Sequence, residues 1–469
     1  MSGGPHTSLA GSQAPTGTEA VAAVSAGTAS VSDVAARCLA QVADLDPAIG
    51  AFRVINDQAV RSRAKQLDDR GAGPLRGLVV GIKDVIDTAD LPTGYGSALF
   101  TDHQPAADAE VVAALRKAGA IVLGKTESTE FAMFQPTRTR NPVDWARTPG
   151  GSSSGSAAAV AAGMVPVALG TQTAGSVVRP AAYCGVYGFK PSWGWTSTAG
   201  IWRLSEHLDT VGLFARCVAD LRLTYQVLSS AAAGTPRRTA RPAGKPAVAV
   251  LSTEDWGNAD GDVRAALSSA AGRLSDDGWE VREMAMPPAW RHLPGQQEVL
   301  MAAEVAKNLH AALGDRVGQI SDSAQAIVAW GDHCLAAEYL AALEARAEAL
   351  QALVPLAAVT DLLLAPSALG VAPVGLDFTG DPVMCRPWTL LGVPAANVPA
   401  WRRPDGLPVG VQLIGTRRDD LGYLTNLALA EAALTNPAAA SNPASLADPA
   451  ALANQADLTN PVALTPKED

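Results

Sequence analysis

The sequence predicts an α/β fold, because short apolar runs alternate with segments of helical spacing. The runs Leu78–Ile82, Ala120–Leu123 and Val165–Leu169 have the length and composition of buried strands. An amphipathic segment, Ala109–Ala118, and a small-residue segment, Ala157–Gly163, are predicted to be helices between them. Strands that alternate with helices are typical of a sheet covered by helices. Periodicity alone defines the class no further than this.

The composition is that of a globular enzyme. Of the 469 residues 48% are hydrophobic and only 5% aromatic, and no apolar run spans a membrane without interruption. The net charge of −10 and the pI of about 5.2 argue against nucleic acid or an anionic membrane as a partner. Five scattered cysteines without a CxxC pair favour neither a disulfide framework nor a zinc site. Since the N-terminus also shows no secretory signal, we expect a cytoplasmic protein.

The chain is expected to begin with a disordered segment followed by a capped helix. Residues 1–18 are polar and rich in Gly, Ser and Thr, which favours disorder. Ser32 is predicted to cap the helix that follows. The apolar residues expected on one face of this helix are Val34, Cys38, Leu39 and Val42. A Pro/Gly-rich link then leads to the first buried strand, which ends at Lys83, and pattern alone favours a solvated strand terminus there.

The segment GAIVLGKT, Gly119–Thr126, matches the phosphate-binding pattern GxxxxGK[ST]. A phosphate cradle needs a flexible turn between its glycines, with a strand before it and a helix after it. Here the residues between the glycines belong in a core strand, and a helix precedes them. We therefore reject an NTPase.

The segment Gly151–Gly155 matches GxSxG, the nucleophile elbow of α/β-hydrolases. That elbow follows a strand, whereas the residues before this segment are loop-like, and it also needs an acid and a histidine later in the chain. The later histidines, none in a recognisable loop context, are His207, His292, His310 and His333. A Ser-His-Asp triad stays open as an alternative.

The chemistry of the chain centres on a stretch rich in Gly, Ser and Ala. Gly150–Pro191 reads GGSSSGSAAAVAAGMVPVALGTQTAGSVVRPAAYCGVYGFKP. It resembles the signature of the amidase signature family of serine hydrolases. The run ending at Lys83 resembles the one that carries the family's catalytic lysine, and Thr389–Gly415 resembles its closing segment. The resemblance implies a large mixed β-sheet core with helices on both faces, in a single domain over residues 19–434.

The resemblance also implies a Ser-Ser-Lys catalytic triad. Ser176 would attack the carbonyl carbon, Ser152 would relay the proton, and Lys83 would be the base. A lysine is a base only when neutral, so its pKa of about 10.4 must fall by roughly three units. Burial at the end of an apolar strand lowers a lysine pKa. Asp84 need not oppose this, because neighbouring residues on a strand point to opposite faces.

Backbone features of the two serine turns follow from the same resemblance. The turn Thr173-Ala174-Gly175 would supply N–H groups to the oxyanion of the tetrahedral intermediate. The peptide bond Gly151–Ser152 would be cis. The remaining serines of the first turn are interpreted as N-terminal caps of the Ala-rich helix: Ser153, Ser154 and Ser156.

Several positions depart from the family's commonest pattern. Ser154 replaces a glycine, and Gln172 and Ala174 stand where Asp and Gly are frequent. Arg179 lies directly before Pro180 rather than two residues ahead of a proline. None of these changes removes a catalytic group, so we interpret them as marking a subgroup.

The expected function is hydrolysis of amide C–N bonds through an acyl-enzyme, with aryl or hydrophobic amides as substrates. This preference rests on tryptophans in the segments that flank the active loops: Trp193, Trp195, Trp202, Trp330 and Trp388. The residues expected to contact the substrate are Met133, Phe134, Gln135, Gln172 and Trp202. Carbamates share the planar carbonyl group, so cleavage of urethanes is a further hypothesis.

Two alternatives stand beside this function. The family also includes glutamine-hydrolysing A-type subunits of tRNA-dependent amidotransferases, which would need a partner subunit. A scaffold without catalysis is disfavoured because all three triad residues are present. We expect a monomer or homodimer that acts on a small-molecule amide or carbamate, with no nucleic acid, membrane, metal or cofactor. The expected regions are a catalytic core at about 75–215, a helical pocket region at about 285–355 and a low-complexity tail at 435–469.

Overall fold

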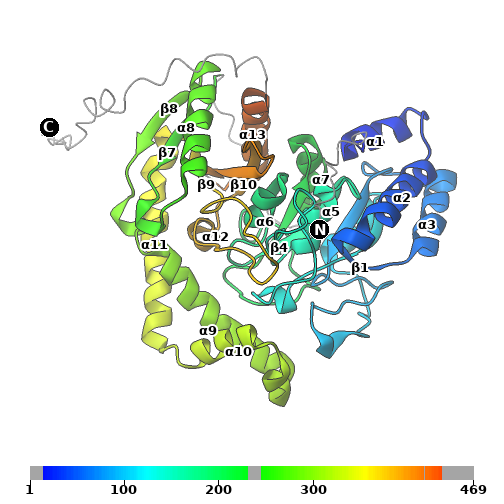
Figure 1. The fold of residues 1–469 in the computed structure, drawn as a ribbon, viewed down its shortest axis with the longest axis horizontal. Coiled ribbons are helices and arrows are strands. Elements are labelled where there is room, and N and C mark those ends of the chain that lie inside the picture. The colour runs from blue at the N-terminus through cyan, green and yellow to red at the C-terminus, as the bar shows by residue number, and fades with distance from the viewer. Residues whose placement is uncertain (1–13, 231–243, 417, 436–469) are drawn as a thin grey trace, which may run out of the picture.

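The computed structural model describes residues 14–230, 244–416 and 418–435, and its centre is one 11-stranded mixed sheet (Figure 1). The strand order is β1-β3-β2-β4-β6-β5-β10-β11-β9-β7-β8. The strands are β1 (Phe52–Ile55), β2 (Val79–Lys83), β3 (Ile121–Thr126), β4 (Val167–Gln172), β5 (Tyr187–Lys190), β6 (Thr210–Ala215), β7 (Ala247–Leu251), β8 (Glu280–Met284), β9 (Leu362–Pro366), β10 (Ala395–Arg402) and β11 (Pro408–Gly415). The expectation of a large mixed sheet is confirmed.

Helices cover both faces of this sheet, because side chains along its buried strands alternate between two apolar clusters. Val80 and Ile82 of β2 pack in a cluster with α4 and α7, whereas Val79 packs in another with α2, α3 and α5. The helices are α1 (Gly17–Ser25), α2 (Val31–Ile49), α3 (Asp57–Arg70), α4 (Glu110–Lys117), α5 (Ser154–Ala161), α6 (Val178–Cys184), α7 (Val218–Ser230), α8 (Gly261–Asp276), α9 (Leu293–Leu313), α10 (Asp322–Asp332), α11 (Ala336–Val359), α12 (Arg386–Leu391) and α13 (Asp420–Thr435). This is the α/β architecture that the resemblance implies.

The pairing of the central strands brings the candidate residues to one edge of the sheet. Strand β2 is parallel to both β3 and β4, and β4 is antiparallel to β6. The carboxyl ends of parallel strands meet at the same edge. Lys83 ends β2 and Gln172 ends β4, so the loops that follow these two strands are neighbours.

The region predicted to be helical at about 285–355 contains α9, α10 and most of α11. Figure 1 shows these helices extending from the sheet beside its central strands. Helix α9 packs against α10, α11 and α12. This packing holds α9 and α10 beside the carboxyl edge of the sheet, where residues of both helices line a pocket.

The ends of the first two helices differ from the expectation. Helix α2 begins at Val31, and its cap is Ser30 rather than Ser32. Ser30 Oγ accepts a hydrogen bond from Asp33 N while the Asp33 carboxylate accepts one from Ser30 N, a capping box that places the cap two residues earlier. Helix α1 begins at Gly17, so residues 17 and 18 are helical. Residues 1–13, and the tail at 435–469 apart from Thr435, lie outside the described residues.

The segment that matches a phosphate-binding loop is a core strand, as expected. Gly124, Lys125 and Thr126 all lie in β3, and α4 precedes it. In the described ranges, no helix has the length and apolar character needed to cross a membrane. The same residues contain no group of three or more His, Cys, Asp or Glu side chains placed to hold a metal ion.

Candidate active site

Lys83 is the last residue of β2, and its amine is enclosed. The side chain is 0% exposed, and Nζ donates hydrogen bonds to Ser152 Oγ at 2.7 Å and to Thr171 Oγ1 at 2.9 Å. No carboxylate forms an ion pair with Lys83 in the described part of the chain. Burial holds the pKa of Lys83 well below its ordinary value, and the charge of Asp209 opposes this only in part. The solvated strand terminus favoured by pattern alone is therefore not found.

Asp84 faces away from the Lys83 amine. Its carboxylate forms ion pairs with Arg53 at 3.3 Å and with Lys125 at 3.9 Å. As expected from strand geometry, it does not raise the pKa of the neighbouring lysine.

Ser152 lies in the loop before α5, against the end of β2. It is 1% exposed, and the peptide bond between Gly151 and Ser152 is cis, as the resemblance implies. Its carbonyl oxygen accepts a hydrogen bond from Thr129 N at 3.1 Å. The Ser152 hydroxyl itself accepts the hydrogen bond from the Lys83 amine.

The other serines of this turn do not cap α5, contrary to the expectation. Ser153 is the N-cap residue but makes no side-chain capping bond, and its hydroxyl donates to Thr171 O at 3.3 Å. Ser154 Oγ donates to Gly150 O at 2.7 Å, and Ser156 Oγ donates to Leu169 O at 2.8 Å. Helix α5 packs on β4, and the hydroxyls of Ser153 and Ser156 donate to carbonyl groups of that strand.

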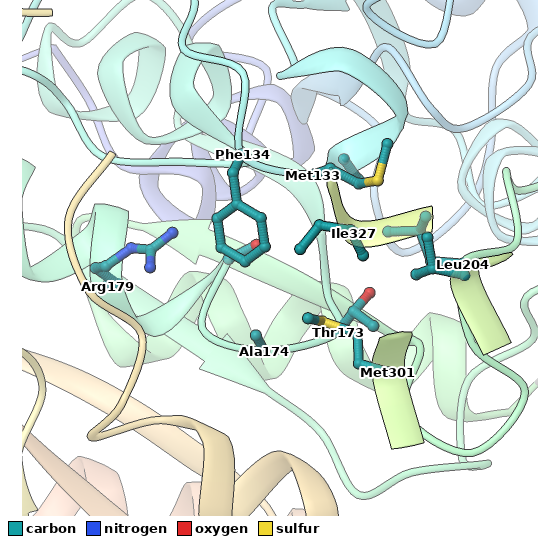
Figure 2. A pocket seen from close by; sticks show the side chains of 11 residues that line it. Met133, Phe134, Thr173, Ala174, Arg179, Leu204, Met301 and Ile327 are labelled. Atoms are coloured by element: carbon teal, nitrogen blue, oxygen red, sulfur yellow. The ribbon is translucent and has the colours of Figure 1, made fainter. Parts of the chain in front are cut away.

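Ser176 lies in the loop between β4 and α6 and lines a pocket (Figure 2). Its side chain is 7% exposed, so it can reach a ligand in the pocket. Three segments far apart in sequence form the pocket wall: the residues after β3, the loop before β6, and helices α9 and α10. The apolar residues of this wall are Met133, Phe134, Leu204, Met301, Val305 and Ile327.

The loop that carries Ser176 is held by its carbonyl groups. Gln297 Nε2 donates to Thr173 O at 2.8 Å, and Thr389 Oγ1 donates to Ala174 O at 2.7 Å. Gly175 O accepts from the first turn of α6. In the described residues, the N–H groups of Ala174, Gly175 and Ser176 have no acceptor. This loop can therefore present N–H donors to an oxyanion.

Gln172 lies behind the nucleophile loop and not in the pocket. It is fully buried, and its Oε1 accepts hydrogen bonds from Val177 N at 2.9 Å and Val178 N at 3.1 Å. Its Nε2 donates to Thr389 Oγ1 at 2.9 Å. Gln172 therefore does not line the pocket that contains Ser176, because its amide is bonded to the backbone at the start of α6 and to Thr389. The neutral amide makes contacts that a carboxylate could make only in part.

The expected substrate contacts divide into two groups. Met133 and Phe134 line the pocket together with Ala174 and Arg179 (Figure 2). Gln135 is exposed and accepts a hydrogen bond from Ser323, so it does not reach the pocket. These three residues are consecutive, but the backbone turns after the short helix at Glu130–Ala132 and carries Gln135 outward.

The tryptophans do not line the pocket. Trp202 stacks on Phe131, with ring centroids 4.6 Å apart, and Trp388 packs between Trp256 and Trp290 in the core. Trp330 is 42% exposed. The expectation of an aromatic pocket wall is therefore wrong for tryptophan, since proximity in sequence to an active loop does not set the direction of a side chain.

The alternative Ser-His-Asp triad finds no support in the geometry. His207 contacts Glu304 at 2.5 Å, His310 contacts Asp332, and His333 contacts its own helix. None of the histidines in the described residues contacts a serine of the first turn.

Residues outside the recognised motifs also support the site. Asp209, directly before β6, accepts hydrogen bonds from Thr173 Oγ1 at 2.6 Å and from the backbone N–H groups of Leu204 and Ser205. Burial raises the pKa of Asp209 to about 6. No sequence motif marks these supporting residues, which are Asp209, Gln297 and Thr389. The one signal that could have indicated Asp209 is its position, an acidic residue directly before an apolar strand.

The structure places the Ser152 hydroxyl beside the buried amine of Lys83, and it places Ser176 in the wall of a pocket, on a loop whose N–H groups have no acceptor among the described residues. A family model described as Amidase matches residues 33–424 of the chain.

The chain belongs to the amidase family.

Its activity class is therefore that of an amidase-family enzyme acting on C–N bonds. Among curated relatives, the A-type subunit of a glutamyl-tRNA(Gln) amidotransferase from Symbiobacterium thermophilum is 34% identical over 83% of this chain and 91% of the relative. The structure of 6-aminohexanoate cyclic dimer hydrolase complexed with substrate is 25% identical, with a TM-score of 0.79 over 92% of this chain and 98% of that one. The structure of the A-type subunit of glutamyl-tRNA(Gln) amidotransferase from Thermotoga maritima is 27% identical, with a TM-score of 0.73 over 91% of this chain and 96% of that one.

These comparisons overturn one expectation drawn from the sequence. We expected a monomer or homodimer that acts on a small-molecule amide or carbamate without nucleic acid. Relatives at 34% identity are named as one subunit of an amidotransferase for glutamyl-tRNA(Gln), so this expectation is wrong. The net charge of −10 on which it rested is a sum over the whole surface, and it does not exclude a partner reached through another subunit.

Proposed function

We propose that this protein hydrolyses a carboxamide through a Ser-Ser-Lys mechanism, and that it does so as the glutamine-hydrolysing subunit of a tRNA-dependent amidotransferase. The observation that carries the chemistry is the 2.7 Å hydrogen bond between Lys83 Nζ and Ser152 Oγ inside a site without water access to the lysine. A buried amine without a carboxylate partner is favoured in its neutral form, which is the form that can accept a proton.

In the proposed reaction, Ser176 Oγ attacks the amide carbon while its proton moves to Ser152 and the proton of Ser152 moves to Lys83. The carbonyl oxygen becomes an oxyanion that the N–H groups of the Ala174–Ser176 loop receive. Collapse of this intermediate breaks the C–N bond, and the proton returns through Ser152 to the leaving nitrogen. Water then cleaves the acyl ester by the same proton route, which restores Ser176.

The amidotransferase role is supported by the relatives rather than by the apolar wall of the pocket. A curated relative that covers 83% of the chain at 34% identity carries that name. In such an enzyme, hydrolysis of glutamine supplies the ammonia for amidation of the glutamyl group. If this protein has the same role, it acts together with a partner subunit.

A second candidate is hydrolysis of hydrophobic amides or carbamates. The specific observation that favours it is the apolar wall of the pocket, which includes Phe134, Met301 and Ile327. Such a wall would receive an alkyl or aryl acyl group.

The test compares the two candidates directly. Ammonia release from glutamine would be measured for the purified chain, alone and with the other subunits of a glutamyl-tRNA(Gln) amidotransferase. An aryl anilide and the matching aryl carbamate would be assayed beside it. We expect glutamine hydrolysis that rises when the other subunits are present. Turnover of the anilide or carbamate without turnover of glutamine would favour the second candidate.

Two serine variants serve as controls in each assay. Ser176→Ala is expected to abolish turnover of every substrate. Ser153→Ala removes a hydroxyl only one residue from Ser152, and it is expected to keep most of the activity because its hydroxyl bonds to a strand carbonyl. Equal activity of Ser176→Ala and the wild type would contradict the assignment of Ser176 as the nucleophile.

A further inference from the structure

Arg179 is a buried arginine in the wall of the same pocket as Ser176. Its side chain is 1% exposed. Figure 2 shows its guanidinium directed toward the ring of Phe134. The positive charge therefore lies in a mostly apolar pocket, three residues after the serine proposed as nucleophile.

Only one nitrogen of this guanidinium has a partner in the described residues. Arg179 Nη2 donates to Gly151 O at 2.7 Å and to Thr379 Oγ1 at 3.5 Å. Nε and Nη1 are buried and have no acceptor. These two nitrogens carry three of the five N–H groups of an arginine side chain. Buried donors without acceptors are costly and rare in folded proteins.

No carboxylate of the described residues neutralises Arg179. The groups that oppose the effect of burial on its pKa are Tyr183, Cys385 and Asp381. Asp381, the carboxylate among them, is exposed, accepts a hydrogen bond from Val383 N and forms no ion pair with Arg179. Burial lowers the pKa of Arg179, as expected for a cation without a counter-ion. A cation held in this way is normally paired, since the cost of burying an isolated charge is large.

A second buried arginine nearby shows the contrast. Arg386, at the start of α12, donates to Gln297 Oε1 at 2.6 Å and forms an ion pair with Glu298 at 2.9 Å. The fold thus supplies acceptors for one buried arginine beside the nucleophile loop and leaves the other with donors free in the pocket.

We propose that Arg179 receives a carboxylate group of the substrate, so that the enzyme acts on amides that carry a carboxylate a few bonds from the scissile carbonyl. This inference rests on the proposed amide hydrolysis at Ser176, and glutamine belongs to the substrate class that it defines. The apolar wall strengthens the ion pair, because charges attract more strongly where water is excluded.

The pocket then has two distinct ends. The N–H groups of the Ala174–Ser176 loop receive the carbonyl oxygen that becomes the oxyanion. Arg179 fixes the other end of the substrate through its carboxylate, and Phe134 and Met301 contact the methylene groups between them. A neutral amide of the same length leaves the N–H groups of Arg179 without an acceptor, so we expect it to bind weakly.

The test uses two amides of equal carbon number, glutaramate and pentanamide, of which only the first has a carboxylate. We expect the wild type to prefer glutaramate in kcat/KM. Arg179→Gln is expected to lower kcat/KM for glutaramate about 10- to 100-fold, mostly through KM, and to lower kcat/KM for pentanamide much less, so that the preference is lost. Arg179→Lys is expected to recover part of the preference. Arg216→Gln, which removes a half-buried arginine bonded to carbonyl groups outside the pocket, is expected to keep it.

A purely structural role gives a different result. Arg179 also holds Gly151 O, next to Ser152, so a structural role would lower the rates of both amides equally. That outcome, or a wild type without preference for glutaramate, overturns the proposal while amide hydrolysis stands.

If neither amide is hydrolysed, that result counts against the proposed function and not against the role of Arg179. A binding measurement then tests the role of Arg179. Binding of glutaramate and of pentanamide to Ser176→Ala would be measured by calorimetry, with and without Arg179→Gln. We expect glutaramate to bind more tightly than pentanamide, and the added Arg179→Gln to remove the difference. Equal affinities of the two amides for Ser176→Ala overturn the role of Arg179, even if Arg179→Gln fails to fold.

Discussion

Two lysines lie at the ends of neighbouring parallel strands of the sheet, and their surroundings differ in one decisive way. Lys83 is the last residue of β2, Lys125 is the residue before the last of β3, and both side chains are 0% exposed. Lys125 donates to Ile86 O and Thr93 Oγ1, and it faces the carboxylate of Asp84 at 3.9 Å. Among the described residues, the hydrogen-bond partners of the Lys83 amine are the hydroxyl groups of Ser152 and Thr171.

The carboxylates near Lys125 partly oppose the lowering of its pKa by burial. Burial lowers the pKa of Lys125 only to about 8, because Asp84, Asp87 and Asp90 oppose the effect. Burial also holds the pKa of Lys83 well below its ordinary value, and the group that opposes this effect is Asp209. Burial alone therefore does not make a lysine a base. The absence of a carboxylate beside Lys83, among the described residues, is what distinguishes a candidate proton acceptor from a structural cation.

The largest expected effect comes from removing Lys83. Lys83→Met is expected to lower kcat about 10²- to 10⁴-fold, the usual contribution of a general base. The variant should also unfold at higher urea concentration at neutral pH. The folded-state pKa of Lys83 is lowered, so its burial costs stability below the unfolded pKa of about 10.5, and that cost shrinks as pH rises toward that value.

Rates and urea unfolding curves, both measured from pH 6 to pH 10, check the prediction. A variant that is inactive and also less stable at neutral pH would contradict it, because that result would make Lys83 a structural residue.

The same substitution at Lys125 is expected to do the opposite. Lys125→Met leaves the buried carboxylate of Asp84 with Arg53 as its remaining ion-pair partner, so we expect a loss of about 3 kcal/mol in the free energy of unfolding. The rate of the protein that remains folded should change much less than in Lys83→Met. Urea unfolding and active-site titration would separate the two effects. A loss of kcat as large as that of Lys83→Met would erase the distinction between the two strand ends.

Removing the charge of Asp209 is expected to have a smaller effect, which is a shift in the pH dependence of kcat/KM. Activity requires neutral Lys83, so kcat/KM is expected to fall as pH decreases through the lowered pKa of the amine. The negative charge of Asp209 raises the Lys83 pKa, and its removal in Asp209→Asn is expected to move this acidic limb to lower pH. Asp220→Asn, which removes a buried carboxylate that holds α1, should leave the limb in place. A limb that does not move in Asp209→Asn would show that another group controls it.

The smallest effect is expected at Thr171, the second hydroxyl partner of Lys83. Thr171→Val removes an acceptor for the amine and is expected to reduce kcat about fivefold, by roughly 1 kcal/mol, because Lys83 is then oriented by Ser152 alone. Thr171→Ser keeps the hydroxyl and serves as the control. If the valine and serine variants have equal rates, the hydroxyl does not orient the amine.

The sequence carried the fold class and the neighbourhood of the proposed triad. Lys83, Ser152 and Ser176 stand in short motifs, and a hydrogen bond joins two of them, Lys83 and Ser152. The spacing of apolar residues in the sequence also predicted the buried face of α2 correctly, because helical periodicity alone determines that face. The apolar face of α2 depends on local sequence, whereas the proximity of Lys83 and Ser152 was expected from the family resemblance.

Features that depend on contacts between distant segments could not be predicted. Gln297 lies on α9 and Thr389 on α12, yet both hold carbonyl groups of the nucleophile loop. Gln135 follows two pocket residues but faces solvent, since a turn of the backbone decides its direction. The free N–H groups of Arg179 became evident only when every residue packed around it was known.

The central claim is that neutral Lys83 activates Ser176, and it can be tested without knowing the substrate. A small sulfonyl fluoride would be reacted with the protein at a series of pH values, and the labelled residue and rate would be followed by mass spectrometry. We predict that Ser176 is labelled, at a rate that rises with pH and levels off above the lowered pKa of Lys83, and that Lys83→Met is labelled at least about 10²-fold more slowly. Labelling of Lys83→Met at the wild-type rate would contradict the claim.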